Sequence, residues 1–221
     1  MKTLHDTSIV ICCHNVDYFI FKCLDSLKTH SPESEIIIVD SNSPKKDYFY
    51  IAKSKYDAKI IEGNSNYELG AWRLASNTYE RDSYLFLQDS VIQKKQIPQE
   101  ILQSEFLAIE ALPSWEGCNN INIEGTKSAL AKDKIQINPD FHMICGSMML
   151  IKNTLWKQLN ERIPNFVPKN KIDSCNSERI LGIVMTDLGF NPGNHMLQKG
   201  SWHQHQPNNG EYFTKIWKGR L

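Results

Sequence analysis

An apolar segment at residues 84–87 runs directly into Gln88, Asp89 and Ser90, and this junction constrains the fold more than any other stretch. A strand covered on both faces is continuously apolar, and ligands in open α/β sheets lie beyond the carboxyl ends of such strands. The junction therefore predicts a buried strand that carries Asp89 to a binding site. A plain polar turn is the alternative, because turns favour the same residue types.

The first ninety residues repeat this strand pattern and alternate it with helical spacing. Strands are predicted at residues 8–13, 35–40, 58–62 and 84–88, and helices at 16–30, 46–55 and 68–79. Successive strand–helix units form parallel sheets with right-handed crossovers. We therefore expect an α/β fold with a mostly parallel central sheet flanked by helices and a Rossmann-like N-terminal half.

Polar residues follow three of these strands, at His14–Asn15, at Asp40 and at Gln88–Ser90. In a parallel sheet these strand ends meet at one edge. The sequence contains neither GxGxxG nor a P-loop, so any bound phosphate needs another partner. A divalent metal on Asp89 is the economical candidate, because Mg²⁺ and Mn²⁺ prefer carboxylate oxygens together with substrate phosphates.

The overall composition excludes several classes of protein. Lysine plus arginine and aspartate plus glutamate both number 25, so the net charge is zero and nucleic-acid binding is disfavoured. No apolar run reaches the length of a membrane span, and residues 1–7 lack the apolar core of a signal peptide. The six cysteines show no CxxC spacing, which favours reduced thiols. We expect a cytoplasmic protein with no nucleic-acid partner and no membrane span.

The second half has a less regular pattern. A strand is predicted at residues 143–151, where Gly146 allows a backbone or a ligand to approach closely, and helices are predicted around 97–109, after Asn153 and at 174–188. Glu178 then falls in the first turn of the last helix, where the helix dipole favours a carboxylate whatever its role. The functional alternative is that Glu178 serves as a general base. Trp115 is either an interior tryptophan or a ring against which a ligand packs.

The C-terminal tail holds His203 and His205, which share a face if the segment is extended. Imidazole is a common metal ligand, but two neighbouring surface histidines are the more frequent explanation of such a pair. The basic and aromatic stretch at 212–220 either folds over the site, with Lys215, Lys218 or Arg220 near any bound phosphates, or forms an ordinary closing helix.

The order and spacing of residues 8–15, 23–27 and 35–43 resemble the opening of family 2 type glycosyltransferases with the GT-A fold. Residues 66–71 and 87–91 are similar to the rhamnan-synthesis type of these enzymes. The resemblance covers residues 8–91 well and the remainder in patches. It implies one GT-A-like domain over residues 1–221, with a nucleotide-binding half at 1–91 and an acceptor-side half at 92–221.

The resemblance also implies an inverting hexosyltransferase of polysaccharide biosynthesis, with a carboxylate base, a divalent metal, a UDP-, GDP- or dTDP-sugar donor and a glycan acceptor. In such an enzyme Trp115 would be a platform for a sugar ring, and Lys215, Lys218 or Arg220 would lie near the donor phosphates. Glu178 would be the base, and Asp89 with His203 or His205 would hold Mn²⁺ or Mg²⁺. Contacts to the nucleotide-sugar are expected at Cys13, Asn15, Asp40, Asn42, Gly70, Arg73, Gln88, Gly146 and Ser147.

One departure from the family pattern bears on the metal. The family carries Asp-x-Asp, whereas this chain has Gln88-Asp89-Ser90. If the last family aspartate aligns on Ser90, the metal loses its best ligand. Two other functions stay open: a catalytically silent carbohydrate-binding or scaffold domain, and a sugar nucleotidyltransferase of related fold, whose Gly-rich phosphate loop is absent after the first strand.

Overall fold

The computed structural model describes residues 7–116, 119–198 and 210–216 of the 221-residue chain. The helices are α1 (Phe19–His30), α2 (Asp47–Tyr56), α3 (Tyr67–Thr78), α4 (Gln99–Leu102), α5 (Asn120–Lys132), α6 (Asn153–Arg162) and α7 (Lys171–Asp187). The strands are β1 (Thr7–Cys13), β2 (Ile36–Asp40), β3 (Lys59–Ile61), β4 (Ser83–Gln88), β5 (Val91–Gln93), β6 (Phe106–Ala108), β7 (Ala111–Pro113), β8 (His142–Ile144), β9 (Met149–Lys152) and β10 (Phe213–Lys215). Two 3-10 turns are η2 (Cys145–Ser147) and η3 (Pro192–Asn194).

The central sheet has six strands in the order β3-β2-β1-β4-β9-β6. The first four run parallel, whereas β9 is antiparallel to both β4 and β6. This arrangement confirms the expected α/β fold with a mostly parallel sheet. In the register, Cys13 pairs with Asp40 and Cys12 pairs with Gln88, so the ends of β1, β2 and β4 lie side by side.

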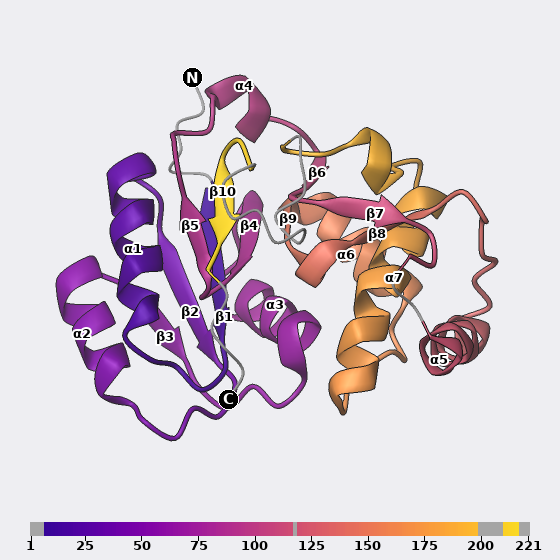
Figure 1. Cartoon of the computed structure of the whole chain (residues 1–221), viewed down its shortest axis with the longest axis horizontal. Coiled ribbons are helices and arrows are strands. Elements are labelled where there is room, and N and C mark those ends of the chain that lie inside the picture. The colour runs from indigo at the N-terminus through magenta and orange to yellow at the C-terminus, as the bar shows by residue number, and fades with distance from the viewer. Residues whose placement is uncertain (1–6, 117–118, 199–209, 217–221) are drawn as a thin grey trace.

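Helices cover both faces of the sheet (Figure 1). Val10 and Phe86 pack in one buried cluster with residues of α3, α6 and α7, while Ile9 and Leu85 pack in a second cluster with residues of α1 and α2. Neighbouring residues on a strand point to opposite faces, which is why strands covered on both sides are apolar throughout.

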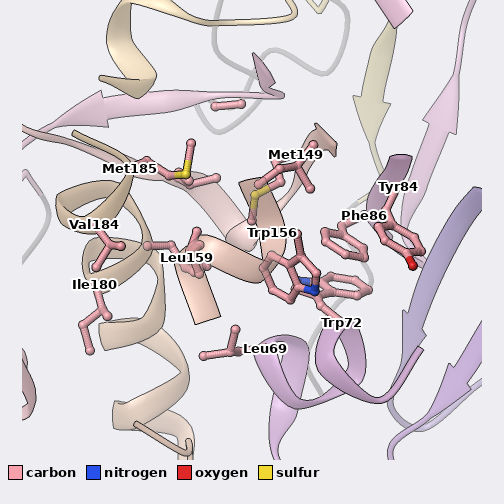
Figure 2. Packing of buried hydrophobic residues seen from close by; sticks show 14 of the residues in the cluster. Leu69, Trp72, Tyr84, Phe86, Met149, Trp156, Leu159, Ile180, Val184 and Met185 are labelled. Atoms are coloured by element: carbon pink, nitrogen blue, oxygen red, sulfur yellow. The ribbon is translucent and has the colours of Figure 1, made fainter. Parts of the chain in front are cut away.

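The cluster on the α3 side of the sheet is built around aromatic rings (Figure 2). The Phe86 ring stacks on Trp72 at 4.9 Å between centroids and meets Trp156 edge to face at 5.0 Å. Truncating a buried ring of this kind to alanine costs about 3–5 kcal/mol. The indole Nε1 of Trp72 also donates to the Ser147 carbonyl at 3.1 Å, so the same core fixes the position of η2.

Two predictions for the second half are wrong in detail. The apolar run at 143–151 is not one strand, because Gly146 and Ser147 have positive φ values of 61° and 55° and turn the chain between β8 and β9. The helix expected around 97–109 is only the short α4, because Phe106 and Ala108 pair with β9 as strand β6. Pairing with a distant strand outweighs the helical spacing of the apolar residues there.

The last helix begins earlier than expected. Its first residue is Lys171, and the Asn170 side chain accepts a hydrogen bond from the Asp173 amide as N-cap. Glu178 therefore lies beyond the first turn, where the helix dipole no longer favours a carboxylate. At the C-terminus, residues 213–215 form strand β10, antiparallel to β5, and not the start of a closing helix. Within the described ranges, no helix is long and apolar enough to cross a membrane.

Candidate active site

The polar ends of β1, β2 and β4 lie together, as expected. Because neighbouring side chains on a strand point to opposite faces, only alternate residues face α3. Cys12 packs in the cluster that includes α3, whereas Cys13 packs in the cluster that includes α1. Gln88 shares the register position of Cys12 and bonds to α3, as described below. Cys12, and not the expected Cys13, therefore faces this group through its side chain. Burial, followed by the charge of Glu68, raises the pKa of the Cys12 thiol.

Gln88 lies at the centre of a hydrogen-bonded chain of side chains. Its Nε2 donates to Glu68 Oε1 at 3.1 Å, and its Oε1 accepts from Lys215 Nζ at 2.8 Å. Ser174 Oγ donates to the other Glu68 oxygen at 2.9 Å. The chain thus links four elements that are far apart in the sequence: β10, β4, α3 and α7.

Glu178 belongs to the same neighbourhood, four residues after Ser174 on α7. The backbone amide of Gly146 donates to Glu178 Oε1 at 3.0 Å. Burial raises the pKa of Glu178; the charge of Glu68 acts in the same direction, while Arg179 and the Gly146 amide oppose it. A carboxylate with a raised pKa accepts a proton more readily, which is the property required of a general base near neutral pH.

The turn η2 needs its glycine. A Cβ on Gly146 would lie 2.8 Å from Met148 Cε and 3.3 Å from Gln88 Nε2, in addition to the positive φ of this residue. Ser147 Oγ lies 3.3 Å from Ser177 Oγ on α7. The structure therefore brings Gly146 and Ser147 beside both Gln88 and the helix that carries Glu178.

Asp40, at the end of β2, is fully buried and held by its own loop. Its Oδ1 accepts from the Ser43 amide at 2.9 Å, and its Oδ2 pairs with Lys46. Asn15 and Asn42 follow β1 and β2, are exposed, and have positive φ values of 54° and 59°. Asparagine tolerates this backbone region, so both residues also have a structural reason to occupy these turns.

The structure does not bring Arg73 to this group. Its guanidinium donates to Asn160 Oδ1 at 2.7 Å and to the carbonyls of Ile163 and Phe166 at 2.9 and 2.6 Å. These bonds fasten α3 to the end of α6 and to the segment after it. They give Arg73 a structural role, and its expected contact with the nucleotide-sugar stays a prediction.

Gly70 lies in α3 and not at a strand end, and its role there is close packing. A Cβ there would lie 2.3 Å from Asn66 Cβ and 2.8 Å from Asn64 Oδ1. The glycine therefore lets Asn64 fold back under the start of α3, from where its Nδ2 donates to Ser41 Oγ at 2.7 Å. Ser41 directly follows Asp40, so Gly70 supports the end of β2 indirectly.

Asp89 directly follows β4, with 8% of its surface exposed, and its amide donates to the Cys12 carbonyl at 3.2 Å. His203 and His205 lie outside the described residues. Within the described ranges, no group of three or more His, Cys, Asp or Glu side chains is placed to hold a metal ion. Asp89 still fits a hard divalent cation, because Mg²⁺ is commonly held by one or two carboxylates with substrate phosphates and water.

Sequence reasoning gave no role to Glu68 or Ser174. The role of Glu68 could have been predicted from its position. It lies in the first turn of the helix after the third strand, and therefore at the same sheet edge as Asp40 and Gln88. Ser174 lies one helical turn before Glu178, a spacing that places both on one helix face. Trp115 is half-buried and packs edge to face on Phe141, with 5.1 Å between ring centroids, which is the interior alternative.

The model of Glycosyl transferase family 2 matches residues 8–90, the segment that contains β1 to β4. A search among curated proteins gives no match.

Solved structures resemble the chain more widely. The crystal structure of TarS from S. aureus is 14% identical, covers 80% of this chain and 33% of its own, and has a TM-score of 0.48. The crystal structure of GalNAc-T7 with UDP, GalNAc and Mn²⁺ is 15% identical, covers 79% of this chain and 40% of its own, and has a TM-score of 0.54. This chain thus spans less than half the length of either protein. The likeness to GalNAc-T7 shows a shared fold, and the part of the chain that forms β1 to β4 is similar to glycosyl transferase family 2.

Proposed function

We propose that this chain transfers a sugar from a nucleotide-diphosphate donor to a hydroxyl of a glycan acceptor, with inversion and with Glu178 as general base. The observation that carries the proposal is the placement of Glu178. Its carboxylate accepts from the Gly146 amide beside the ends of the parallel strands, where ligands bind in open α/β folds. The same neighbourhood raises its pKa through burial.

The reaction needs one proton acceptor. Glu178 takes the proton of the acceptor hydroxyl while that oxygen forms a bond to the anomeric carbon. The bond from the anomeric carbon to the diphosphate breaks, and its electron pair leaves with the nucleoside diphosphate. The Gly146 amide holds the Glu178 carboxylate in place for this transfer, since a positioned base requires a fixed orientation.

The donor half of the site would be formed by the ends of β1, β2 and β4. Asp40 and Asn42 would contact the nucleoside, and Gly146 and Ser147 would line the sugar. UDP is the first nucleotide to test, because it was bound in the GalNAc-T7 structure.

Mn²⁺ or Mg²⁺ would be held by Asp89 and by the phosphates of the donor. When bound, such an ion neutralises negative charge that develops on the leaving diphosphate. GalNAc-T7 was crystallised with Mn²⁺, which makes this ion the first to add. Replacing Asp89 with asparagine should weaken the dependence of nucleotide binding on Mn²⁺, which titration of the nucleotide at several Mn²⁺ concentrations would measure. Unchanged Mn²⁺ dependence in Asp89→Asn would remove Asp89 as a ligand.

The test of the function is release of nucleoside diphosphate from UDP-, GDP- and dTDP-sugars in the presence of oligosaccharide acceptors. Glu178→Gln should reduce turnover by about 10²–10⁴-fold, the usual contribution of a general base, while nucleotide binding is retained. Glutamine keeps an oxygen for the Gly146 amide, so the variant should fold.

A matched control is Glu124→Gln, which makes the same chemical change at an exposed position on α5, where Glu124 pairs with Lys127 at 3.0 Å. It should turn over like the wild type. Equal turnover in Glu178→Gln and the wild type would rule out Glu178 as base. A wild-type chain that binds no donor would favour the silent scaffold.

A further inference from the structure

The short C-terminal strand β10 is firmly attached next to Asp89. Lys215 pairs with Val91, two residues after Asp89, and the Ile216 amide donates to the Ser90 carbonyl at 2.7 Å. At the other end of the strand, the buried Gln198 side chain accepts from the Phe213 amide at 2.9 Å. The position of Lys215 is therefore fixed by backbone pairing and not only by its own side chain.

The Lys215 ammonium reaches Gln88, the residue immediately before Asp89. Nζ donates to Gln88 Oε1 at 2.8 Å, and the Gln88 amide group is itself oriented by its donation to Glu68. Gln88 is neutral, so it positions the ammonium group without contributing a charge of its own. An aspartate at position 88 would instead place a second carboxylate beside Glu68.

We propose that Lys215 binds the diphosphate of the donor and that Gln88 positions its ammonium group for this contact. The proposal rests on the proposed function and deepens it, since it names a residue of the acceptor-side half that completes the donor site. Lysine is a compact point charge suited to phosphate oxygens, and a fixed cation stabilises negative charge as it develops on a leaving diphosphate.

The carboxylates around this position explain why a cation is needed there. Glu68 lies one hydrogen bond beyond Gln88, Asp89 follows Gln88 in the chain, and Glu178 lies on the neighbouring helix. A diphosphate entering among these groups meets negative charge on several sides. The ammonium group of Lys215 offsets that repulsion at the strand end where the phosphates would lie.

The experiment is calorimetric titration of inorganic pyrophosphate into the full chain in metal-free buffer, so that a metal on Asp89 contributes nothing. Lys215→Met should bind pyrophosphate at least about tenfold more weakly, as expected when a charged hydrogen-bond donor is removed. Lys215→Arg keeps the charge and should retain most of the affinity. A nucleoside diphosphate, tested as UDP, GDP and dTDP, should displace the bound pyrophosphate.

Lys95→Met is the matched control, because Lys95 lies just past β5 and its Nζ pairs with the exposed Glu211 at 2.7 Å. It should bind pyrophosphate like the wild type, which separates a specific contact from loss of general positive charge. A thermal denaturation curve for each variant verifies that it is folded.

Equal pyrophosphate affinity in the wild type and Lys215→Met, including no binding by either, would overturn the assignment of Lys215. The assignment would also be overturned if no nucleoside diphosphate displaced the bound pyrophosphate. Loss of turnover in Glu178→Gln would still support the transferase in both cases. A chain that neither binds nor cleaves any nucleotide-sugar would overturn the proposed function itself, whatever the pyrophosphate result.

Discussion

Replacing Gly146 with alanine perturbs the turn that joins the donor side of the site to the base. Gly146 has a φ of 61°, and an added Cβ would lie 2.8 Å from Met148 Cε and 3.3 Å from Gln88 Nε2. Its amide also holds Glu178. One added methyl group thus strains the backbone and pushes on the amide that links Glu68 with Lys215.

The expected loss of stability in Gly146→Ala has two contributions. A non-glycine residue in the left-handed region costs about 1–2 kcal/mol. The contact with Met148 involves the end of a flexible side chain, whereas Gln88 must move by a few tenths of an ångström, and shifting such side chains off their preferred rotamers costs about 0.5–1.5 kcal/mol. We expect Gly146→Ala to lower the free energy of unfolding by about 1.5–3.5 kcal/mol.

Urea denaturation measures the stability, and Gly189→Ala provides the matched control. Gly189 has a φ of 92°, and a Cβ there would have no atom within 4 Å. In Gly189→Ala the free energy of unfolding should fall only by the backbone contribution, about 1–2 kcal/mol. Donor affinity and turnover should be unchanged. Gly146→Ala should in addition lose turnover. Equal loss of stability in both variants with normal turnover in Gly146→Ala would refute the proposed linkage of η2 to the site.

Two further predictions concern carboxylates with shifted pKa values. Because burial raises the pKa of Glu178, folding favours its protonated form, and its contribution to stability falls as the pH rises from 4.5 through the raised pKa. Glu178→Gln should therefore be at least as stable as the wild type at pH 7, and the acid limb of kcat/KM should lie above pH 4.5; a limb at or below pH 4.5 would contradict the assignment. Burial opposes ionisation of Glu35, but hydrogen bonds from Arg81, Lys59 and Ser8 outweigh it and lower its pKa to about 2. Glu35→Gln should cost about 1–2 kcal/mol at pH 7 after allowance for solvent screening, and denaturation curves should show this difference shrinking as the pH falls from 4.5 to 2; a difference independent of pH would show that the ion pairs are not its source.

The first ninety residues could be interpreted almost completely from the sequence. Apolar strands that end in polar residues, separated by helical spacing, specify a parallel sheet, and the ends of β1, β2 and β4 do lie together. The direction of individual side chains was harder to predict. Cys12 and Cys13 differ only in which face of the pleat they occupy, and that depends on the exact register of the strand.

The second half depends on contacts between distant residues, which no local pattern encodes. Phe106 joins the sheet as part of β6 because β9 is available as its partner. Lys215 reaches Gln88 only after β10 pairs with β5. The guanidinium group of Arg73 donates to the carbonyls of Ile163 and Phe166, which are distant in the sequence. No local pattern around Arg73 indicates these partners.

The most direct test of the account is a thermal-shift panel of UDP-, GDP- and dTDP-sugars with the full chain, each with and without Mn²⁺. A donor at 100 times its dissociation constant stabilises the folded state by about 2.7 kcal/mol, and for a chain of this size each 1 kcal/mol raises Tm by about 2–4 °C. The account predicts a rise of about 5–10 °C with the sugars of one nucleotide, larger when Mn²⁺ is present. No shift with any of these donors at millimolar concentration would contradict the proposal that this site binds a nucleotide-sugar.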